Sequence, residues 1–126
     1  MKFELNSSEQ NVNKIQSYSR TGFKIQNTIH DTNIVISRTR LLKNHLCDTF
    51  DMFAMQHLDG IITWKPEIIL LGTGSKLIIP TENFTAYVNK HAIGFEVMDT
   101  GAACRSYNVL IDEGRDVVAC LFLKDT

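Results

Sequence analysis

The sequence lacks the features that define several large functional classes. No run approaches the roughly 20 consecutive apolar residues of a membrane-spanning helix. Residues 1–14 contain neither the apolar run of a secretory signal nor the arginine-rich pattern of a transit peptide. The net charge is −1, the pI is about 6.4 and the basic residues are scattered. We therefore expect a cytoplasmic protein that binds no nucleic acid and makes no direct membrane contact.

Motifs for metal binding and for common kinds of catalysis are also missing. The three cysteines form no CxxC pair, and an odd number of them fits reduced thiols better than a disulfide framework. The four histidines lie far apart and lack the spacing of metal ligands, so we predict no metal and no cofactor. There is no GxSxG motif and no defensible Ser/His/Asp arrangement. The sequence thus favours a protein that is not an enzyme and predicts no catalytic residues.

What is present is an ordinary globular composition. The chain has 126 residues, of which 44% are apolar and 21% are charged, enough for one domain with one core. Residues 1–20 are rich in Asn, Ser and Gln and contain few apolar anchors, among them Ile15 and Tyr18. We interpret residues 1–20 as a polar N-terminal arm that packs through these anchors, and residues 21–126 as a single compact domain.

The second half of the chain carries the clearest pattern. The short runs Ile68–Leu71 and Val117–Leu123 are apolar, and Phe95–Met98 is apolar except for Glu96. Turn residues bound all three runs, as in strands. Helical spacing separates them: a helix over Thr81–His91 capped by Thr81, and a second helix capped by Asp99 or Thr100 and closed by Gly114. This alternation predicts a mixed α/β fold, with a parallel sheet built as β-α-β-α-β in residues 67–123.

The first half is less regular. Gly22–Ile29 alternates and Asn33–Ser37 is β-branched, so we predict an antiparallel hairpin that turns at residues 30–32 and forms an N-terminal layer. Residues 38–50 show no clean period, and a further strand or an irregular crossing are both compatible with them. Asp51 is placed to cap a helix that begins near Met52.

Two glycine turns follow neighbouring predicted strands and define a candidate crevice. The ends of parallel strands meet at one edge of a sheet, where ligands bind near helix N-termini. The candidate residues are Gly72, Thr73, Gly74, Asp99, Thr100, Arg105 and Asn108.

Each of these candidate residues also has a structural interpretation. The glycines permit tight turns and Asp99 caps a helix. Arg105 is an anion ligand, an ion-pair partner of Asp99 or Glu113, or simply solvated, and Asn108 would tie down the glycine turn. Cys104, at the same helix start, is interpreted as a buried and unreactive thiol.

The motifs in this half resemble a family of small domains of unknown function. They are Pro66-Glu67, Leu70–Gly74, Val97–Thr100, Ala102–Arg105, Tyr107–Leu110 and Glu113–Arg115. The family includes the mitochondrial complex I assembly factor three, the adipogenesis-associated domain proteins and free-standing bacterial members. The resemblance implies a compact α/β domain with a parallel sheet, a packed β-hairpin layer and helices on one side. It implies no established catalytic activity.

Two functions follow as hypotheses. The first is a non-catalytic protein-binding module resembling respiratory-complex assembly factors, with an exposed apolar patch around Phe50, Phe53 and Trp64. The alternative is a small-ligand-binding protein or enzyme that uses the crevice between the turns Gly72–Gly74 and Asp99–Gly101, with Arg105 binding an anionic group. A protein partner is expected from the first hypothesis, and the sequence leaves the oligomeric state open.

Overall fold

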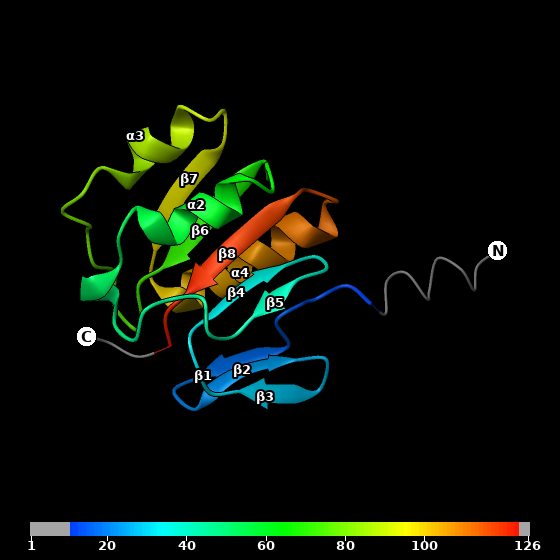
Figure 1. Ribbon diagram of the computed structural model, residues 1–126. Helices are drawn as coiled ribbons and strands as arrows, with labels where there is room; N and C mark the ends of the chain where they lie inside the picture. Colours follow the sequence, from blue (N-terminus) through cyan, green and yellow to red (C-terminus); the bar gives the residue numbers. More distant parts are fainter. Residues whose placement is uncertain (1–10, 124–126) are drawn as a thin grey trace.

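The computed structural model describes residues 11–123, which form a small antiparallel sheet and a larger mixed sheet flanked by helices (Figure 1). The small sheet has the order β1-β2-β3, with the strands β1 (Ser17–Ser19), β2 (Gly22–Ile25) and β3 (Thr28–His30). The half of the predicted arm that is described therefore supplies a strand to this sheet, and its Ile15 side chain is only 5% exposed. Residues 1–10 lie outside the described residues.

The larger sheet has the order β5-β4-β8-β6-β7. Its strands are β4 (Ile34–Ser37), β5 (Leu41–Leu42), β6 (Ile68–Gly72), β7 (Gly94–Met98) and β8 (Val117–Leu121). Strand β6 pairs in parallel with both β7 and β8, whereas β4 pairs antiparallel with β8 and β5. The predicted mixed α/β fold with a β-α-β-α-β parallel unit is confirmed, and β5 is a short strand within the ambiguous residues 38–50.

The predicted pairing of residues 22–29 with 33–37 is wrong. The hairpin closes earlier, because Gln26 and Asn27 adopt φ angles of 52° and 63° and form a two-residue turn between β2 and β3. Strand β4 instead pairs with β8, and all four of its residues are buried. A strand that is apolar on both faces is stable only in a sheet that is covered on both faces. This explains why β4 pairs with β8 and not with the hairpin of β2 and β3.

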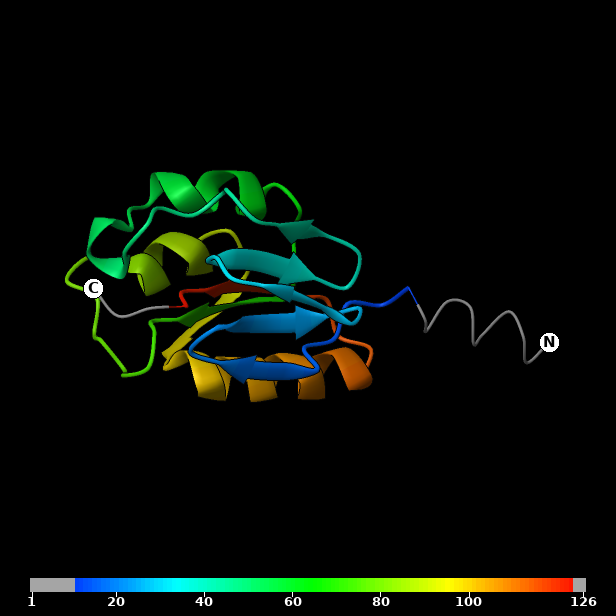
Figure 2. The ribbon, with the colours of Figure 1, turned by 90° about the horizontal axis from the view of Figure 1, so that it is seen from below.

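Helices cover both faces of the larger sheet, so the expected placement of helices on one side is wrong (Figure 2). Helix α4 (Thr100–Asp112) and the small sheet share one apolar cluster with Leu70 and Ala119. On the opposite face, α2 (Gln56–Ile62), α3 (Phe84–Asn89) and the 3₁₀ turn η1 (Phe50–Met52) share a second cluster with Ile69 and Cys120. Adjacent residues of one strand, such as Ile69 and Leu70, belong to different clusters. Both faces of the larger sheet must therefore be covered.

Several helix ends differ from those predicted. Helix α3 begins at Phe84 instead of Thr81, because the Asn83 side chain accepts the capping hydrogen bond from Ala86 N at 3.0 Å. Helix α2 begins at Gln56 instead of near Met52, since the chain first makes the separate 3₁₀ turn η1. The left-handed residue after α3 is Ala92, with a φ of 63°. By contrast, the Asp99 cap and the left-handed Gly114, with a φ of 76°, are confirmed.

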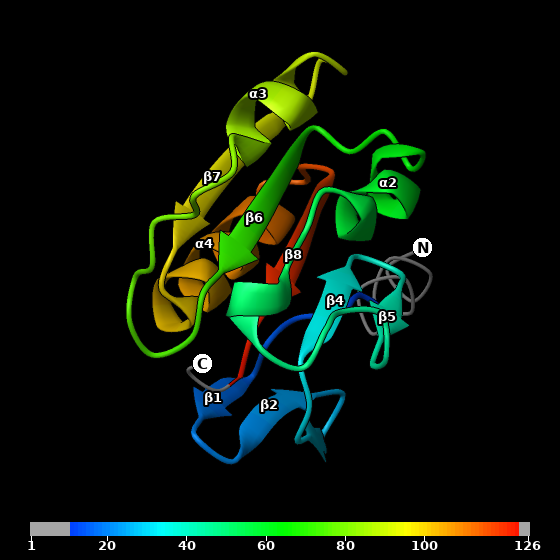
Figure 3. The same cartoon turned by 60° about the vertical axis from the view of Figure 1, so that its left-hand side comes forward.

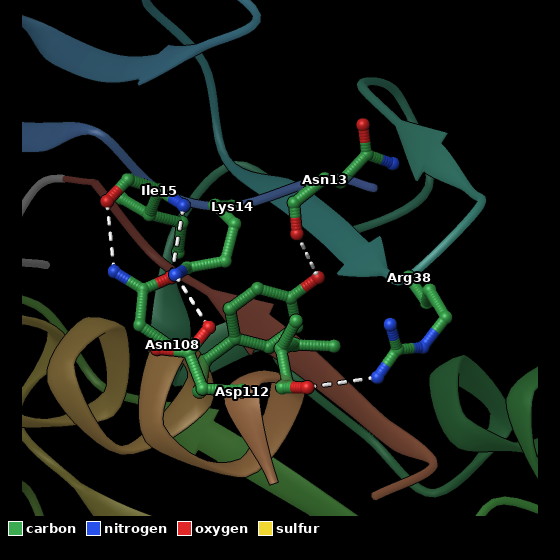
Figure 4. A network of polar contacts seen from close by, with 8 residues as sticks. Asn13, Lys14, Ile15, Arg38, Asn108 and Asp112 are labelled. Atoms are coloured by element: carbon green, nitrogen blue, oxygen red, sulfur yellow. Dashed lines mark hydrogen bonds and ion pairs between the residues drawn. The ribbon is translucent and has the colours of Figure 1, made fainter. Parts of the chain in front are cut away.

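A polar network holds the N-terminal segment on α4 (Figure 4). Asn108 pairs with the backbone of Ile15 like a neighbouring strand: its Oδ1 accepts from Ile15 N at 2.9 Å, and its Nδ2 donates to Ile15 O at 2.8 Å. The buried Tyr107 hydroxyl donates to Asn13 O at 2.7 Å, and Lys14 forms an exposed ion pair with Asp112. Because the Ile15 side chain is buried in the α4 cluster, this network fixes the small sheet relative to the larger one.

Replacement of Asn108 by leucine is expected to lower the free energy of unfolding by about 1–3 kcal/mol, since the Ile15 amide and carbonyl lose their partners. Lys14→Ala is a matched control in the same network, because it breaks an exposed ion pair that is worth less than about 1 kcal/mol. Denaturant unfolding with hydrogen exchange at the Ile15 amide measures both effects. Equal costs for the two variants would contradict the stabilising role assigned to Asn108.

Candidate functional site

The two predicted glycine turns lie in direct contact. Thr73 N donates to Met98 O at 3.0 Å, and Thr100 N donates to Gly74 O at 2.8 Å. In return, Gly74 N donates to the Thr100 hydroxyl at 2.8 Å. The structure therefore brings together the turn after β6 and the start of α4, as the strand order predicts.

Close packing fills the space between these turns. A Cβ atom added to Gly72 would lie 2.8 Å from Thr100 Oγ1 and 2.9 Å from Thr100 Cα, so a larger residue does not fit there. The Thr100 hydroxyl also donates to Phe122 O at 2.7 Å, and both Thr73 and Thr100 are fully buried. These observations support the structural interpretation of the turns, and a ligand crevice between them stays a prediction.

The polar side chains of the turns serve the local backbone. Asp99 Oδ1 accepts from Ala102 N at 2.8 Å and so caps α4. The Thr73 hydroxyl donates to Lys76 O at 2.6 Å and accepts from Ile78 N at 3.0 Å. Thr73 thereby fixes the start of the segment that leads to α3.

Arg105 and Asn108 lie apart from the contact between the turns. Asn108 bonds the N-terminal segment, not the glycine turn that we expected it to tie down. Arg105 is exposed, and its Nη1 lies 3.5 Å from the position of a Cβ on Gly101. Its guanidinium lines what we call the arginine hollow, of about 430 Å³, whose other lining residues are Ile68, Leu70, Glu96, Ser106, Val109, Leu110 and Arg115.

Arg105 forms no ion pair or side-chain hydrogen bond within residues 11–123. Arg115, in contrast, binds Glu67 through Nε and Oε1 at 2.6 Å, and this bond lowers the pKa of the exposed Glu67 carboxyl. The arginine hollow thus combines the paired guanidinium of Arg115, an Arg105 guanidinium without a partner in the described part of the chain, and apolar lining residues that include Leu70.

Burial keeps the thiols of Cys104 and Cys120 in their protonated, unreactive form. Burial raises the pKa of the Cys104 thiol to about 12, and the Cys120 thiol is shifted in the same direction for the same reason. A thiol with such a pKa forms almost no thiolate at neutral pH. Nor do residues 11–123 contain a group of three or more His, Cys, Asp or Glu residues able to hold a metal ion.

The sequence did not reveal an apolar surface around the segment between β6 and α3. What we call the apolar hollow, of about 300 Å³, is lined by Phe50, Asp51, Phe53, Ile78, Ile79, Pro80, Thr81, Glu82 and Phe84. Beside it, Met52, Leu77 and Ile79 are 63%, 53% and 73% exposed. The short apolar run Leu77–Ile79, stopped by Pro80, was the available signal.

The apolar patch expected around Phe50, Phe53 and Trp64 is present only in part. Phe50 and Phe53 are each 5% exposed, yet both form walls of the apolar hollow. Trp64 is half-buried and lies elsewhere, with the Arg40 guanidinium 4.3 Å from its ring centre.

A match to a protein-family model covers residues 15–122, and the family is described as a protein of unknown function, DUF498/DUF598. The chain belongs to this family. The "13 kDa major membrane protein" of Francisella tularensis is 32% identical over 91 residues, which are 71% of this chain and 73% of that protein. The resemblance noted in the motifs is thus confirmed at the level of a family of unknown function, while a link to complex I assembly stays a prediction.

Solved structures share the fold of this DUF498/DUF598 member. A Bordetella parapertussis protein has a TM-score of 0.80 at 24% identity, with 88% of this chain and 95% of that chain covered. A Bordetella pertussis protein described as an Mth938-like domain has a TM-score of 0.75 at 20% identity, with coverages of 90% and 88%. Within residues 11–123, no helix is long and apolar enough to span a membrane.

Replacement of Thr100 by valine is expected to lower the free energy of unfolding by about 2–4 kcal/mol, because Gly74 N and Phe122 O both lose their buried partner. Thr100→Ser keeps the hydroxyl and is expected to retain most of the stability. Chemical denaturation of both variants measures the difference. If valine were as stable as serine at this position, the hydroxyl would not be what joins the turns.

Proposed function

We propose that this protein is a non-catalytic protein-binding module, as the resemblance to respiratory-complex assembly factors implies, and that the apolar hollow is its docking surface. The observation that carries this proposal is the exposure of Met52, Leu77 and Ile79 beside a hollow walled by aromatic rings. Apolar side chains grouped in this way mark interaction surfaces more often than single exposed residues do.

The charges at the apolar hollow favour a protein over a lipid surface as the partner. Its ionisable lining residues are Asp51 and Glu82, and neither lysine nor arginine lines it. Bacterial and organellar membranes present negative headgroups, which carboxylates repel. The Francisella relative is called a membrane protein, and on this argument any contact of the present chain with a membrane runs through a protein partner.

Ile79→Asp is expected to abolish partner binding without unfolding the protein, because the Ile79 side chain is already 73% exposed. Tagged protein is purified from its native cells, and the partner is identified and quantified by mass spectrometry. Ile29→Asp, on β3 of the small sheet and 61% exposed, is the matched control for a new surface charge. Support requires a partner that is lost with the first variant and kept with the second. Equal recovery with both variants would sink the proposal.

A second candidate function rests on the arginine hollow. Within residues 11–123 the Arg105 guanidinium has no partner, and apolar residues line the same hollow, which suits a small amphiphile with one anionic group. The volume of about 430 Å³ lies in the range of ligand sites. In this candidate function Arg105 binds the anionic group, as in the predicted crevice. The small molecule, however, would lie beside the contact between the turns and not within it.

Octanoate serves as the probe for this second function. We expect it to raise the melting temperature of the wild-type protein, because a ligand that binds only the native state stabilises it. The shift should disappear in Arg105→Gln, which keeps the length of the side chain without its charge. Octanol, which lacks the carboxylate, controls for nonspecific apolar binding. An identical response of the wild type and Arg105→Gln to octanoate would exclude this function.

A further inference from the structure

Strand β7 leaves one edge of the larger sheet unpaired. It is the last strand in the order β5-β4-β8-β6-β7. Gly94 N donates to Glu67 O at 2.9 Å and Thr73 N donates to Met98 O at 3.0 Å, so residues 94 and 98 direct their backbone groups toward β6. Because these directions alternate along a strand, the N–H and C=O groups of Phe95 and Val97 point away from the sheet. No hydrogen bond within residues 11–123 uses these four groups.

The segment between β6 and α3 runs beside this edge without pairing with it (Figure 3). A space of about 390 Å³, which we call the edge groove, separates the two; it is lined by Phe95 and Val97 on one side and by residues 79–85 on the other. Residues 79, 80, 81, 82 and 84 also line the apolar hollow, so the same segment forms a wall of both depressions. The position of a sixth strand is therefore bordered but not filled by the described chain.

A second copy of this chain fits the edge poorly. If two β7 edges paired antiparallel through their free groups, Glu96 of each copy would lie directly opposite Glu96 of the other on the same face. Two carboxylates at that separation repel each other, and Glu96 is exposed. Arg105 and Arg115 line the same hollow as Glu96, together with residues of β6 and α4.

We propose that β7 accepts an extended segment of a partner protein as an added strand, with a basic residue opposite Glu96 and apolar residues on either side of it. The four outward backbone groups would supply main-chain hydrogen bonds. The apolar neighbours would pack beside Phe95, Val97 and Ile79 in the edge groove. Glu82 at the same groove favours a cationic segment as well. This inference rests on the proposed protein-binding function and specifies the chemistry of the partner.

Two short peptides serve as probes: one alternates valine with lysine and the other alternates valine with glutamate. In amide NMR titrations we expect the lysine peptide to bind about fivefold tighter and to shift the Phe95 and Val97 signals most. Glu96→Lys should reverse the preference, because it replaces the charge that faces the added strand. Equal binding of both peptides to the wild type, or binding that bypasses β7, would overturn strand addition. So would concentration-dependent pairing of the protein with itself at β7.

Val97→Pro tests the main-chain contribution. Proline removes the outward Val97 N–H but none of the groups that face β6, so we expect a loss of affinity for the lysine peptide of about tenfold or more. Val97→Thr has nearly the same shape, keeps that N–H and should bind like the wild type. The Glu96→Lys result stands independently if the proline variant does not fold.

The cellular experiment separates this inference from the proposed function. Loss of the identified partner with Ile79→Asp but not with Val97→Pro or Glu96→Lys would leave the docking surface intact and reject strand addition. Retention of the partner with Ile79→Asp would reject the proposed function itself.

Discussion

A single buried hydroxyl joins the carboxyl ends of the three parallel strands. Thr100 follows β7 and opens α4, its hydroxyl accepts from Gly74 after β6, and it donates to Phe122 after β8. Gly72 permits this approach, because a Cβ there would lie within 3 Å of Thr100. This contact ties the start of α4 to the chain leaving β6 and β8, in addition to the backbone ladders of the sheet and the Asp99 cap. In open parallel sheets the same edge commonly holds a ligand, whereas here it is occupied by the protein's own backbone and a threonine.

Because the turns pack against each other, the depressions bordered by the segment between β6 and α3 lie beside the larger sheet and not between the turns. The segment between β6 and α3 is anchored at its beginning by Thr73 and at its end by the Asn83 cap. Between these anchors, Leu77 and Ile79 are exposed instead of buried. The segment therefore borders two depressions, one against the aromatic residues of η1 and one against the edge of β7.

The DUF498/DUF598 family is described as of unknown function, so membership of it indicates the fold of this chain but not an activity. Three exposed charged residues of the recognised motifs, Glu67, Arg105 and Arg115, are not used at the contact between the turns. Glu67 and Arg115 pair with each other, and the two arginines line one hollow. The motifs thus contain two kinds of residue. The buried ones join the strand ends, and these exposed ones lie on the face of the larger sheet opposite to the apolar hollow.

The sequence by itself determined the parallel unit, a cap at Asp99 or Thr100 and the close of α4 at Gly114, because strand length, caps and left-handed glycines are local properties. It also indicated that the two glycine turns would meet, since parallel strands place their carboxyl ends together. Only the tertiary structure decided that Ile34–Ser37 pairs with β8 and that helices cover both faces. The same holds for the two depressions, which residues distant in sequence form together. Strand partners and exposure depend on long-range packing, and the composition of a single segment such as Leu77–Ile79 does not specify what covers it.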